Sequence, residues 1–355
     1  MRVLALTKYS ARAASTRQRL LQFAPHLRQH GVEIEVRPLL DDRYMERLAV
    51  DEPHPRLEIA AAYARRLRDV AAAGAFDVLW VQYELFPFLP VIDGILARLV
   101  RIPIVYDIDD AIFHMYDSAG SAAVRHLLGG KLVPLMRRAA VCLCGNAYLA
   151  SYVAQAGGHA EVVPTVVDTD AYVPRLRDDA PPVVGWIGSP STWRYVEPVL
   201  PDILPVVRNH GALFRAVGAA PRAAIVPGVT AVAWSEEQEI AEVQAMDIGI
   251  MPLPDEPWAR GKCGYKLIQY MACGAATVAS PVGVNVDLVA DGKEGFVAQT
   301  GAQWASALDR LLSDRGLRSA MGAAGREKVV RSYSLASQAP RVAAALKQAA
   351  ESRHG

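Results

Sequence analysis

The sequence predicts an α/β fold in which two Rossmann-like domains face each other across a cleft. Short apolar, β-rich runs alternate with longer Ala-, Leu- and Arg-rich segments of helical period along the 355 residues. Continuous apolar strands that are each followed by a helix are typical of parallel sheets covered on both faces. The length also exceeds one ordinary core and suits two domains of about 150 to 180 residues.

Apolar runs define the expected strands of each domain. The runs of the first half are Val3–Thr7, Val32–Leu39, Val78–Tyr83, Ile104–Ile108, Val141–Cys144 and Ala160–Val167. The runs of the second half are Val183–Gly188, Leu213–Val217, Val229–Trp234, Ile248–Pro252, Ala276–Ala279 and Gly295–Ala298. The polar, proline-rich segment between Asp168 and Val183 is the expected linker. Residues 1–172 and 183–333 then form the two domains, and the helical segment 334–355 either crosses back to the first domain or packs where it ends.

The net charge, the cysteines and the lengths of the apolar runs exclude several classes of protein. The net charge of +1 gives no reason to expect nucleic acid as a partner. The sequence has no C-x-x-C pair among its four cysteines, Cys142, Cys144, Cys263 and Cys273. We therefore expect these cysteines to be buried as small apolar side chains in a reducing cytosol. The first apolar run is too short for a signal peptide, and no stretch approaches the roughly 18 apolar residues of a membrane span. We therefore expect a cytoplasmic protein.

The loop after the first strand reads TKYSARAASTRQRL and holds several cations. Ser15 and Gln18 have the spacing of a capping box, which predicts that a helix starts here. Arg17 and Arg19 would then occupy its first turn, where a cation is unfavourable unless an anion is bound. Together with Lys8 they are candidate acceptor-binding residues; the alternative is that the arginines extend into solvent.

The first strand of the second domain ends in a loop of glycines and hydroxyls, VVGWIGSPSTWRYVEP. Gly188 permits close backbone approach, Ser189 and Thr192 offer hydroxyl groups, and Arg194 falls in the first helical turn. The loop resembles a phosphate cradle, although the G-x-x-x-x-G-K-[ST] motif is absent and G-x-x-G alone is a weak signal. We predict that these residues bind the diphosphate of a ligand.

A second candidate for diphosphate binding is the segment GKCGYKLIQYMACG. It predicts a helix over residues 264–273, which Gly274 ends. Lys262, the free amides around Gly264, and Lys266 would form a positive helix N-terminus. Such a terminus suits a diphosphate leaving group.

The same segment begins a series of three motifs. The chain reads QYMACGAATVAS, then PVGVNVDLV, and then DGKEGFVA. These resemble the A-M-A-x-G-x-P-V-V-A-S, V-G-G-x-x-E and D-G-x-x-G motifs of the GT-B nucleotide-sugar glycosyltransferases, most closely glycosyltransferase family 4 (group 1). The resemblance covers about Val183–Ser332 and is only architectural in the first half. It implies a GT-B fold, a donor nucleotide on the C-terminal domain, an acceptor mostly on the N-terminal domain, no catalytic metal and retention of anomeric configuration.

The chain departs from these motifs at three positions. Gln269 stands where the family's second glutamate grips the ribose, and an amide still hydrogen-bonds ribose hydroxyls without charge assistance. Gly261 stands where the first glutamate contacts the donor sugar, so that contact is missing or comes from Asp255 or Glu256. Asp287 replaces the later glutamate conservatively. The departures leave the identity of the sugar open.

An acidic turn, VYDIDDAIFHMYD, follows the strand Ile104–Ile108, at a strand end where α/β domains place active residues. Asp109 and Asp110 are the candidate catalytic residues, which would orient or deprotonate the acceptor hydroxyl. Two other interpretations are open: helix capping, and a metal site of the D-x-D kind found in the GT-A glycosyltransferases. The two Rossmann-like halves argue against the metal. His114 is either a partner of the aspartates or a structural residue.

The expected function is transfer of a sugar from a nucleotide diphosphate sugar to a glycan or lipid-linked acceptor in bacterial polysaccharide or glycoconjugate biosynthesis, with no cofactor. The alternatives are a nucleotide-sugar epimerase of GT-B shape and a non-catalytic nucleotide-sugar-binding subunit. A Rossmann oxidoreductase is disfavoured because no G-x-G-x-x-G follows either first strand. The oligomeric state is open.

Two further groups of residues have competing interpretations. Arg125, Lys131, Arg137 and Arg138 either contact anionic lipid, which would place the protein at the inner face of the membrane, or form a solvated helix face. Trp234 follows a strand where the family binds the nucleobase, but core packing is the preferred interpretation of the ring taken alone.

Overall fold

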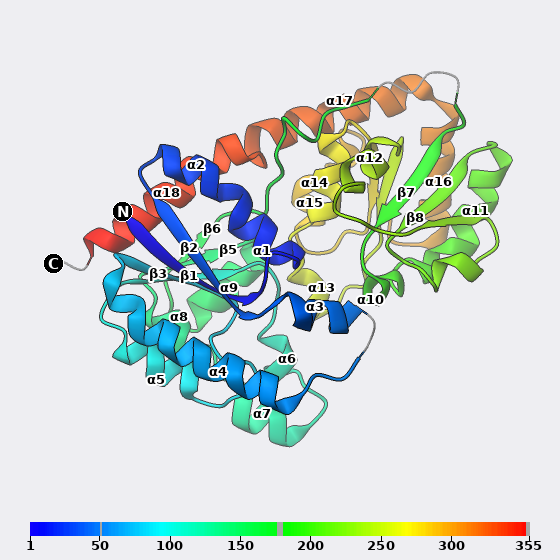
Figure 1. The fold of residues 1–355 in the computed structure, drawn as a ribbon. Helices are drawn as coiled ribbons and strands as arrows, with labels where there is room; N and C mark the ends of the chain where they lie inside the picture. Colours follow the sequence, from blue (N-terminus) through cyan, green and yellow to red (C-terminus); the bar gives the residue numbers. More distant parts are fainter. Residues whose placement is uncertain (50–51, 176–179, 353–355) are drawn as a thin grey trace. The chain divides into compact units, whose positions relative to one another are not determined.

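The computed structural model describes residues 1–49, 52–175 and 180–352 (Figure 1). Residues 176–179 of the expected linker lie outside these ranges. The chain divides into two compact units. Unit 1 contains residues 1–165, 261–263 and 335–355, and unit 2 contains residues 166–260 and 264–334.

Unit 1 is built on a six-stranded sheet of order β2-β1-β3-β4-β5-β6, in which every neighbouring pair is parallel. Its strands are β1 (Arg2–Tyr9), β2 (Glu33–Leu40), β3 (Val78–Gln82), β4 (Ile104–Ile108), β5 (Val141–Cys144) and β6 (Ala160–Val162). The three strands β3, β4 and β5 are buried along their whole length. This burial explains why they read as continuous apolar runs, since helices cover both faces of the sheet.

The helices of unit 1 form two layers. They are α1 (Ala14–Arg19), α2 (Ala24–Gln29), α3 (Asp42–Ala49), α4 (Arg56–Ala71), α5 (Ile92–Leu99), α6 (His114–Asp117), α7 (Ala122–Leu128), α8 (Val133–Arg138), α9 (Ala147–Gln155) and α18 (Leu335–Glu351). Helices α4, α5, α8 and α9 contribute side chains to one hydrophobic cluster with the sheet. Helix α18 packs beside α2 and contacts β3 and β4, so the last helix of the chain completes the first unit.

Unit 2 repeats the architecture with a six-stranded parallel sheet of order β12-β11-β10-β7-β8-β9. Its strands are β7 (Val183–Ile187), β8 (Leu213–Val217), β9 (Val229–Val232), β10 (Ile248–Met251), β11 (Ala276–Ala279) and β12 (Gly295–Val297). Its helices are α10 (Pro190–Trp193), α11 (Leu200–Asn209), α12 (Glu239–Gln244), α13 (Pro257–Arg260), α14 (Tyr265–Ala272), α15 (Asn285–Leu288), α16 (Gly301–Ser313) and α17 (Arg315–Ser332). The paired helices α11 and α16 join one core cluster, and α14 and α17 join another.

A strand is present in each of the predicted runs, and the bounds of β4, β5, β8 and β11 are those predicted. The run Ala160–Val167 is a strand only as far as Val162. Gly264 and Gly274 bound α14 with left-handed φ angles of 68° and 74°, as a glycine-ended helix requires. The four cysteines are free and buried, as expected. Within the described ranges, no helix is long and apolar enough to span a membrane.

The predicted capping box at Ser15 is wrong. Helix α1 begins at Ala14, its N-cap is Ala13, and no side chain caps it. Because the helix ends at Arg19, both arginines belong to its last turn instead of the first. A cation is favourable in the last turn of a helix, so the helix dipole gives no argument for a bound anion at this loop.

Candidate active site

The turn after β4 is organised by a buried ion pair between Arg19 and Asp107. The guanidinium Nε and Nη2 lie 2.9 and 3.0 Å from the two Asp107 oxygens, and Nη1 donates to the Val163 carbonyl at 2.8 Å. Both side chains are only 1% exposed. Arg19 therefore holds α1 against the end of β4, and we do not retain it as an acceptor-binding residue.

Asp109 lies next to this pair and has the most perturbed carboxylate of the turn. Burial raises its pKa to about 7; Arg19 opposes this shift, while the negative charges of Asp110 and Asp107 add to it. Asp109 Oδ1 is buried and has no hydrogen-bond partner among the described residues. The neighbouring Tyr83 holds a left-handed φ of 64°, a strained backbone of the kind that concentrates at functional sites. The carboxylate is thus poised to accept a proton near neutral pH.

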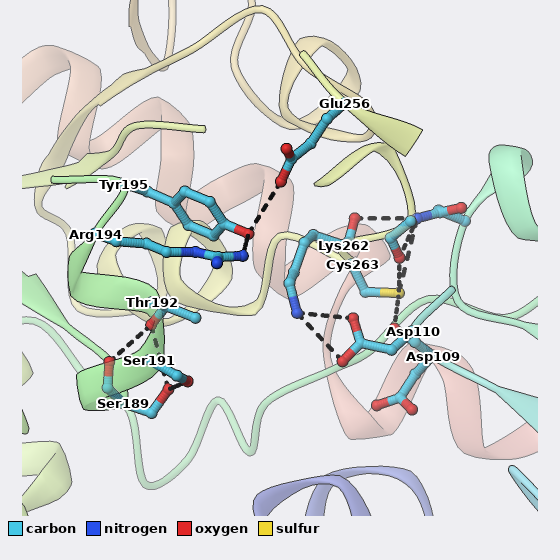
Figure 2. A network of polar contacts seen from close by, with 12 residues as sticks. Asp109, Asp110, Ser189, Ser191, Thr192, Arg194, Tyr195, Glu256, Lys262 and Cys263 are labelled. Atoms are coloured by element: carbon cyan, nitrogen blue, oxygen red, sulfur yellow. Dashed lines mark hydrogen bonds and ion pairs between the residues drawn. The ribbon is translucent and has the colours of Figure 1, made fainter. Parts of the chain in front are cut away.

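Asp110, in contrast, is neutralised by a lysine. Lys262 Nζ lies 2.9 and 3.3 Å from its two oxygens (Figure 2). The backbone around Lys262 is fixed as well, because Asn146 Nδ2 donates to the carbonyls of Gly261 and Lys262 at 3.1 and 3.0 Å. The Cys263 thiol donates to the Asp109 carbonyl at 2.9 Å. These bonds make residues 261–263 part of unit 1, whereas Lys266 belongs to unit 2.

Gly261 explains one departure from the glycosyltransferase motif. A Cβ atom at this position would lie 2.4 Å from the Ala111 Cβ and 3.0 Å from the Ala111 nitrogen. No glutamate fits at a position where even a methyl group clashes. Of the two acids predicted to replace it, Asp255 pairs with Arg260 at 2.7 Å, and Glu256 accepts a hydrogen bond from Tyr195 at 3.2 Å (Figure 2).

Lys8 lies in a buried charge network instead of an open loop. Its ammonium is 2.9 Å from Glu84 Oε1, and Lys131 is 2.8 Å from Glu84 Oε2 and 3.1 Å from Asp93. Tyr116 also donates to Glu84 at 2.7 Å. Lys131 is only 4% exposed, so its predicted place on a solvated or lipid-facing surface is wrong.

Two other candidates of unit 1 make local contacts. Arg17 Nη1 donates to the carbonyls of Ala11 and Arg12 at 3.1 and 2.8 Å and so shapes the loop after β1. The His114 ring contacts Asp117 at 2.7 Å and the Tyr148 hydroxyl at 2.8 Å. These bonds favour the structural interpretation of His114.

In unit 2, the loop after β7 and the start of helix α14 are neighbours, so Gly188 and Lys266, two predicted diphosphate-binding residues, lie close together. A Cβ at Gly188 would lie 2.7 Å from Lys266 Cε and 2.6 Å from the Trp186 ring. Glycine is therefore needed for the lysine to lie across the end of the strand. Lys266 Nζ is 5.5 Å from the centroid of the Trp186 ring, a cation–π distance.

A cluster of hydroxyl groups completes the loop after β7. Ser189 Oγ lies 2.9 Å from Ser191 Oγ and 3.3 Å from Thr192 Oγ1, and the Thr192 hydroxyl donates to the Ser189 carbonyl at 3.0 Å (Figure 2). Arg194 is exposed and donates to the Tyr195 hydroxyl at 2.9 Å. Its predicted place in the first helical turn is wrong, because it is the C-cap of the four-residue helix α10. Exposed hydroxyls beside a lysine can donate several hydrogen bonds to an anion.

Gln269 is buried at 2% exposure and binds a residue that the sequence analysis missed. Its Nε2 donates to Glu239 Oε1 at 2.9 Å and to the Tyr172 hydroxyl at 3.1 Å. The Tyr172 hydroxyl and the Trp234 indole donate to the two Glu239 oxygens at 2.6 and 2.7 Å. Trp234 is 40% exposed, so the core interpretation of this ring is wrong. The signal for Glu239 was present in TAVAWSEEQE, where acids follow the tryptophan directly.

Among the described residues, no group of three or more His, Cys, Asp or Glu side chains has an arrangement suited to a metal ion.

The comparisons with known proteins agree with this architecture. The family model described as "Glycosyl transferases group 1" matches residues 181–314, the region from β7 to α16. Among curated proteins, none matches the chain.

Solved structures match nearly the whole chain at low sequence identity. Sucrose-phosphate synthase from Thermosynechococcus elongatus has a TM-score of 0.70 and 16% identity, over 98% of this chain and 99% of its own. HepE of Anabaena in complex with UDP and glucose has a TM-score of 0.70 and 17% identity, over 98% and 100%. WaaG, a glycosyltransferase involved in lipopolysaccharide biosynthesis, has a TM-score of 0.68 and 14% identity, over 97% and 98%. These matches confirm the predicted GT-B fold over nearly the whole chain, and the group 1 family model matches residues 181–314 within it.

Proposed function

We propose that this protein is a metal-independent hexosyltransferase that moves a sugar from a nucleotide diphosphate sugar to a glycan or lipid-linked acceptor in bacterial polysaccharide or glycoconjugate biosynthesis. The proposal rests on the site in unit 2, where Lys266 lies across Gly188, the residue just before the hydroxyl cluster of Ser189 and Thr192. The proposal includes a cytoplasmic location and, from the family resemblance, retention of anomeric configuration.

The donor diphosphate would bind this site. Lys266 stands in the first turn of α14, where the helix dipole and the amides after Gly264 favour an anion. The cation would stabilise the charge that develops on the leaving diphosphate, and the hydroxyls would fix its position. HepE has been solved with UDP and with UDP-glucose bound, which makes uridine donors the first to test.

The ribose would be held by Glu239 with the help of Gln269. An amide at position 269 has no charge of its own, but it fixes the carboxylate of Glu239 by a hydrogen bond of 2.9 Å. A carboxylate forms stronger, charge-assisted bonds to ribose hydroxyls than an amide does. The half-exposed Trp234, whose indole bonds the same carboxylate, offers a face for the nucleobase.

The acceptor would use Asp109 in unit 1. As the acceptor oxygen attacks the anomeric carbon, the bond from that carbon to the diphosphate oxygen breaks and the nucleoside diphosphate leaves with the electron pair. Asp109 orients the acceptor hydroxyl or takes its proton, a role that fits its raised pKa and its unpartnered oxygen. Asp110 is tied to Lys262 and would position the turn.

The test is turnover by the purified chain with a panel of UDP- and GDP-sugars, with and without oligosaccharide and lipid-linked acceptors. We expect release of nucleoside diphosphate that depends on an acceptor. Isomerisation of the donor sugar in the absence of any acceptor would instead identify an epimerase. Tight nucleotide binding without turnover on every donor and acceptor tried would identify a non-catalytic binding subunit.

A further inference from the structure

Exposed apolar side chains gather on one short segment of unit 1, which we call the α5 surface. It consists of Phe88, Leu89, Val91, Ile95 and Leu99, with exposures of 61%, 39%, 64%, 48% and 68%. Ile95 and Leu99 are spaced four residues apart on α5, a helix in the outer layer of unit 1 (Figure 1), and Val91 is the residue just before the helix. Single exposed apolar residues are ordinary, but a contiguous group of this kind marks an interaction site.

The backbone holds these side chains outward. Phe88 and Val91 have left-handed φ angles of 59° and 54°, a conformation that is unfavourable for side-chain-bearing residues and must be imposed by the surroundings. Tyr63 donates to the Pro87 carbonyl at 2.6 Å, and the Phe88 amide donates to the Tyr116 hydroxyl at 3.2 Å. These two bonds hold the loop at Pro87 and Phe88, where its exposed apolar side chains begin.

Buried charges anchor the same loop from the inside. The Phe86 amide donates to Asp93 at 2.8 Å, and Lys131 donates to the Phe86 carbonyl at 2.7 Å. Asp93 is the single acid of residues 85–106, all of which the structure describes, and it is 0% exposed and paired with Lys131. The outer side of this stretch therefore carries no negative charge.

The cations of the stretch, in contrast, point to the outside. Arg98 and Arg101 are exposed at the C-terminal end of α5. Arg138 of the neighbouring helix α8 reaches the same end, where it donates to the Val100 carbonyl at 3.3 Å. The α5 surface is thus apolar with an arginine rim and no exposed acid.

We propose that the α5 surface docks on an anionic phospholipid bilayer. Apolar side chains enter the boundary between headgroups and acyl chains, and arginines at their edge pair with lipid phosphates. A second copy of the chain fits less well, because its own α5 surface offers no acid to the arginines. The proposal stands apart from sugar transfer, since the lipid contact needs no nucleotide.

The test is co-sedimentation of the full chain with vesicles of phosphatidylcholine mixed equally with phosphatidylglycerol, compared with vesicles of phosphatidylcholine alone. We expect binding to the mixed vesicles that weakens with salt. The variant Ile95→Ser/Leu99→Ser should bind at least about 10-fold less well, because two partly exposed apolar side chains no longer enter the bilayer. The variant Arg98→Gln/Arg101→Gln should lose about 10-fold on the mixed vesicles only.

The matched control is Leu213→Ser/Ile225→Ser, which removes two apolar side chains of 44% and 82% exposure from unit 2. It should bind like the parent, and thermal melting should show that all variants are folded. The arginine variant keeps the test decisive if the Ile95→Ser/Leu99→Ser chain does not fold. The proposal is overturned if the parent does not bind anionic vesicles, or if the control loses as much binding as the Ile95→Ser/Leu99→Ser variant. It is also overturned if the parent self-associates without lipid through Ile95 and Leu99.

Discussion

The two units place opposite kinds of chemistry at equivalent positions, the ends of parallel strands. After β4 in unit 1, acids and bases are buried and paired, and Asp109 retains a buried oxygen without a partner. After β7 in unit 2, hydroxyl groups are exposed and Lys266 lies on a glycine. Burial shifts a pKa, whereas exposed donors bind an anion without titrating. The proposed function rests on this difference: a buried carboxylate with a raised pKa in unit 1, and a lysine with exposed hydroxyl groups in unit 2.

The largest effect should come from Glu84, the centre of the buried charges of unit 1. Glu84→Gln leaves the ammonium groups of Lys8 and Lys131 without their shared carboxylate, which should lower the free energy of unfolding by about 3–5 kcal/mol. Urea denaturation measures the loss. The control is Glu197→Gln, which breaks the exposed pair with Arg222 and should cost less than about 1 kcal/mol. Equal costs would show that the charges of unit 1 are not integral to its fold.

Asp109→Asn should have the next largest effect, on turnover. An amide cannot accept the acceptor proton, so kcat should fall by about 10²-fold or more while donor affinity changes little. Steady-state kinetics and nucleotide titration measure the two quantities. If the variant is less stable but has normal turnover per folded molecule, Asp109 is a structural helix-capping residue and not a catalytic one.

The pH dependence of kcat in the parent protein should reflect the titration of Asp109. Because burial raises the pKa of Asp109 to about 7, the carboxyl is protonated at lower pH and cannot accept a proton. The rate constant kcat should therefore fall about tenfold per pH unit below neutrality. A rate profile measured from pH 5 to 9, in roughly unit steps, shows this limb. The profile of Asp109→Asn should be flat over the range, and an unchanged acidic limb would assign the titration to another group.

The smallest expected effect is that of a chelator, which should leave activity unchanged. The reason is that the Lys262 ammonium already occupies the space beside Asp110, and Arg19 neutralises Asp107. Activity is compared before and after dialysis against excess EDTA. A loss that manganese or magnesium restores would make the acidic turn a metal site.

Much of the fold follows from the sequence because burial on both sides of a parallel sheet forces continuous apolar runs. For this reason the bounds of β4 and β8 are predictable to the residue. The site in unit 2 is partly predictable for a related reason. Gly188 and Lys266 come from a strand end and a helix start, which local patterns locate well.

The sequence did not allow us to predict which charged side chains are buried or which partners they pair with. Lysine and arginine usually lie on the surface, but Lys8, Arg19 and Lys131 are buried. Each is paired with a carboxylate far away in the chain, at separations of 76, 88 and 47 residues respectively. The acids after Trp234 were visible in the sequence, but which of them pairs with Gln269, 30 residues away, was not. Local patterns carry no information about such partners, since only the packed tertiary structure brings them together.

The central claim, that the nucleotide diphosphate binds at Lys266, is tested most directly by calorimetric titration of Lys266→Ala. We expect UDP, or whichever nucleoside diphosphate binds the parent most tightly, to bind the variant about 10- to 100-fold more weakly, the scale of one charge-assisted hydrogen bond. Affinity for the bare nucleoside should barely change, and Lys293→Ala, which removes an exposed lysine of the same unit, should bind like the parent. If Lys266→Ala binds the diphosphate as tightly as the parent, the donor site is not on this loop and helix.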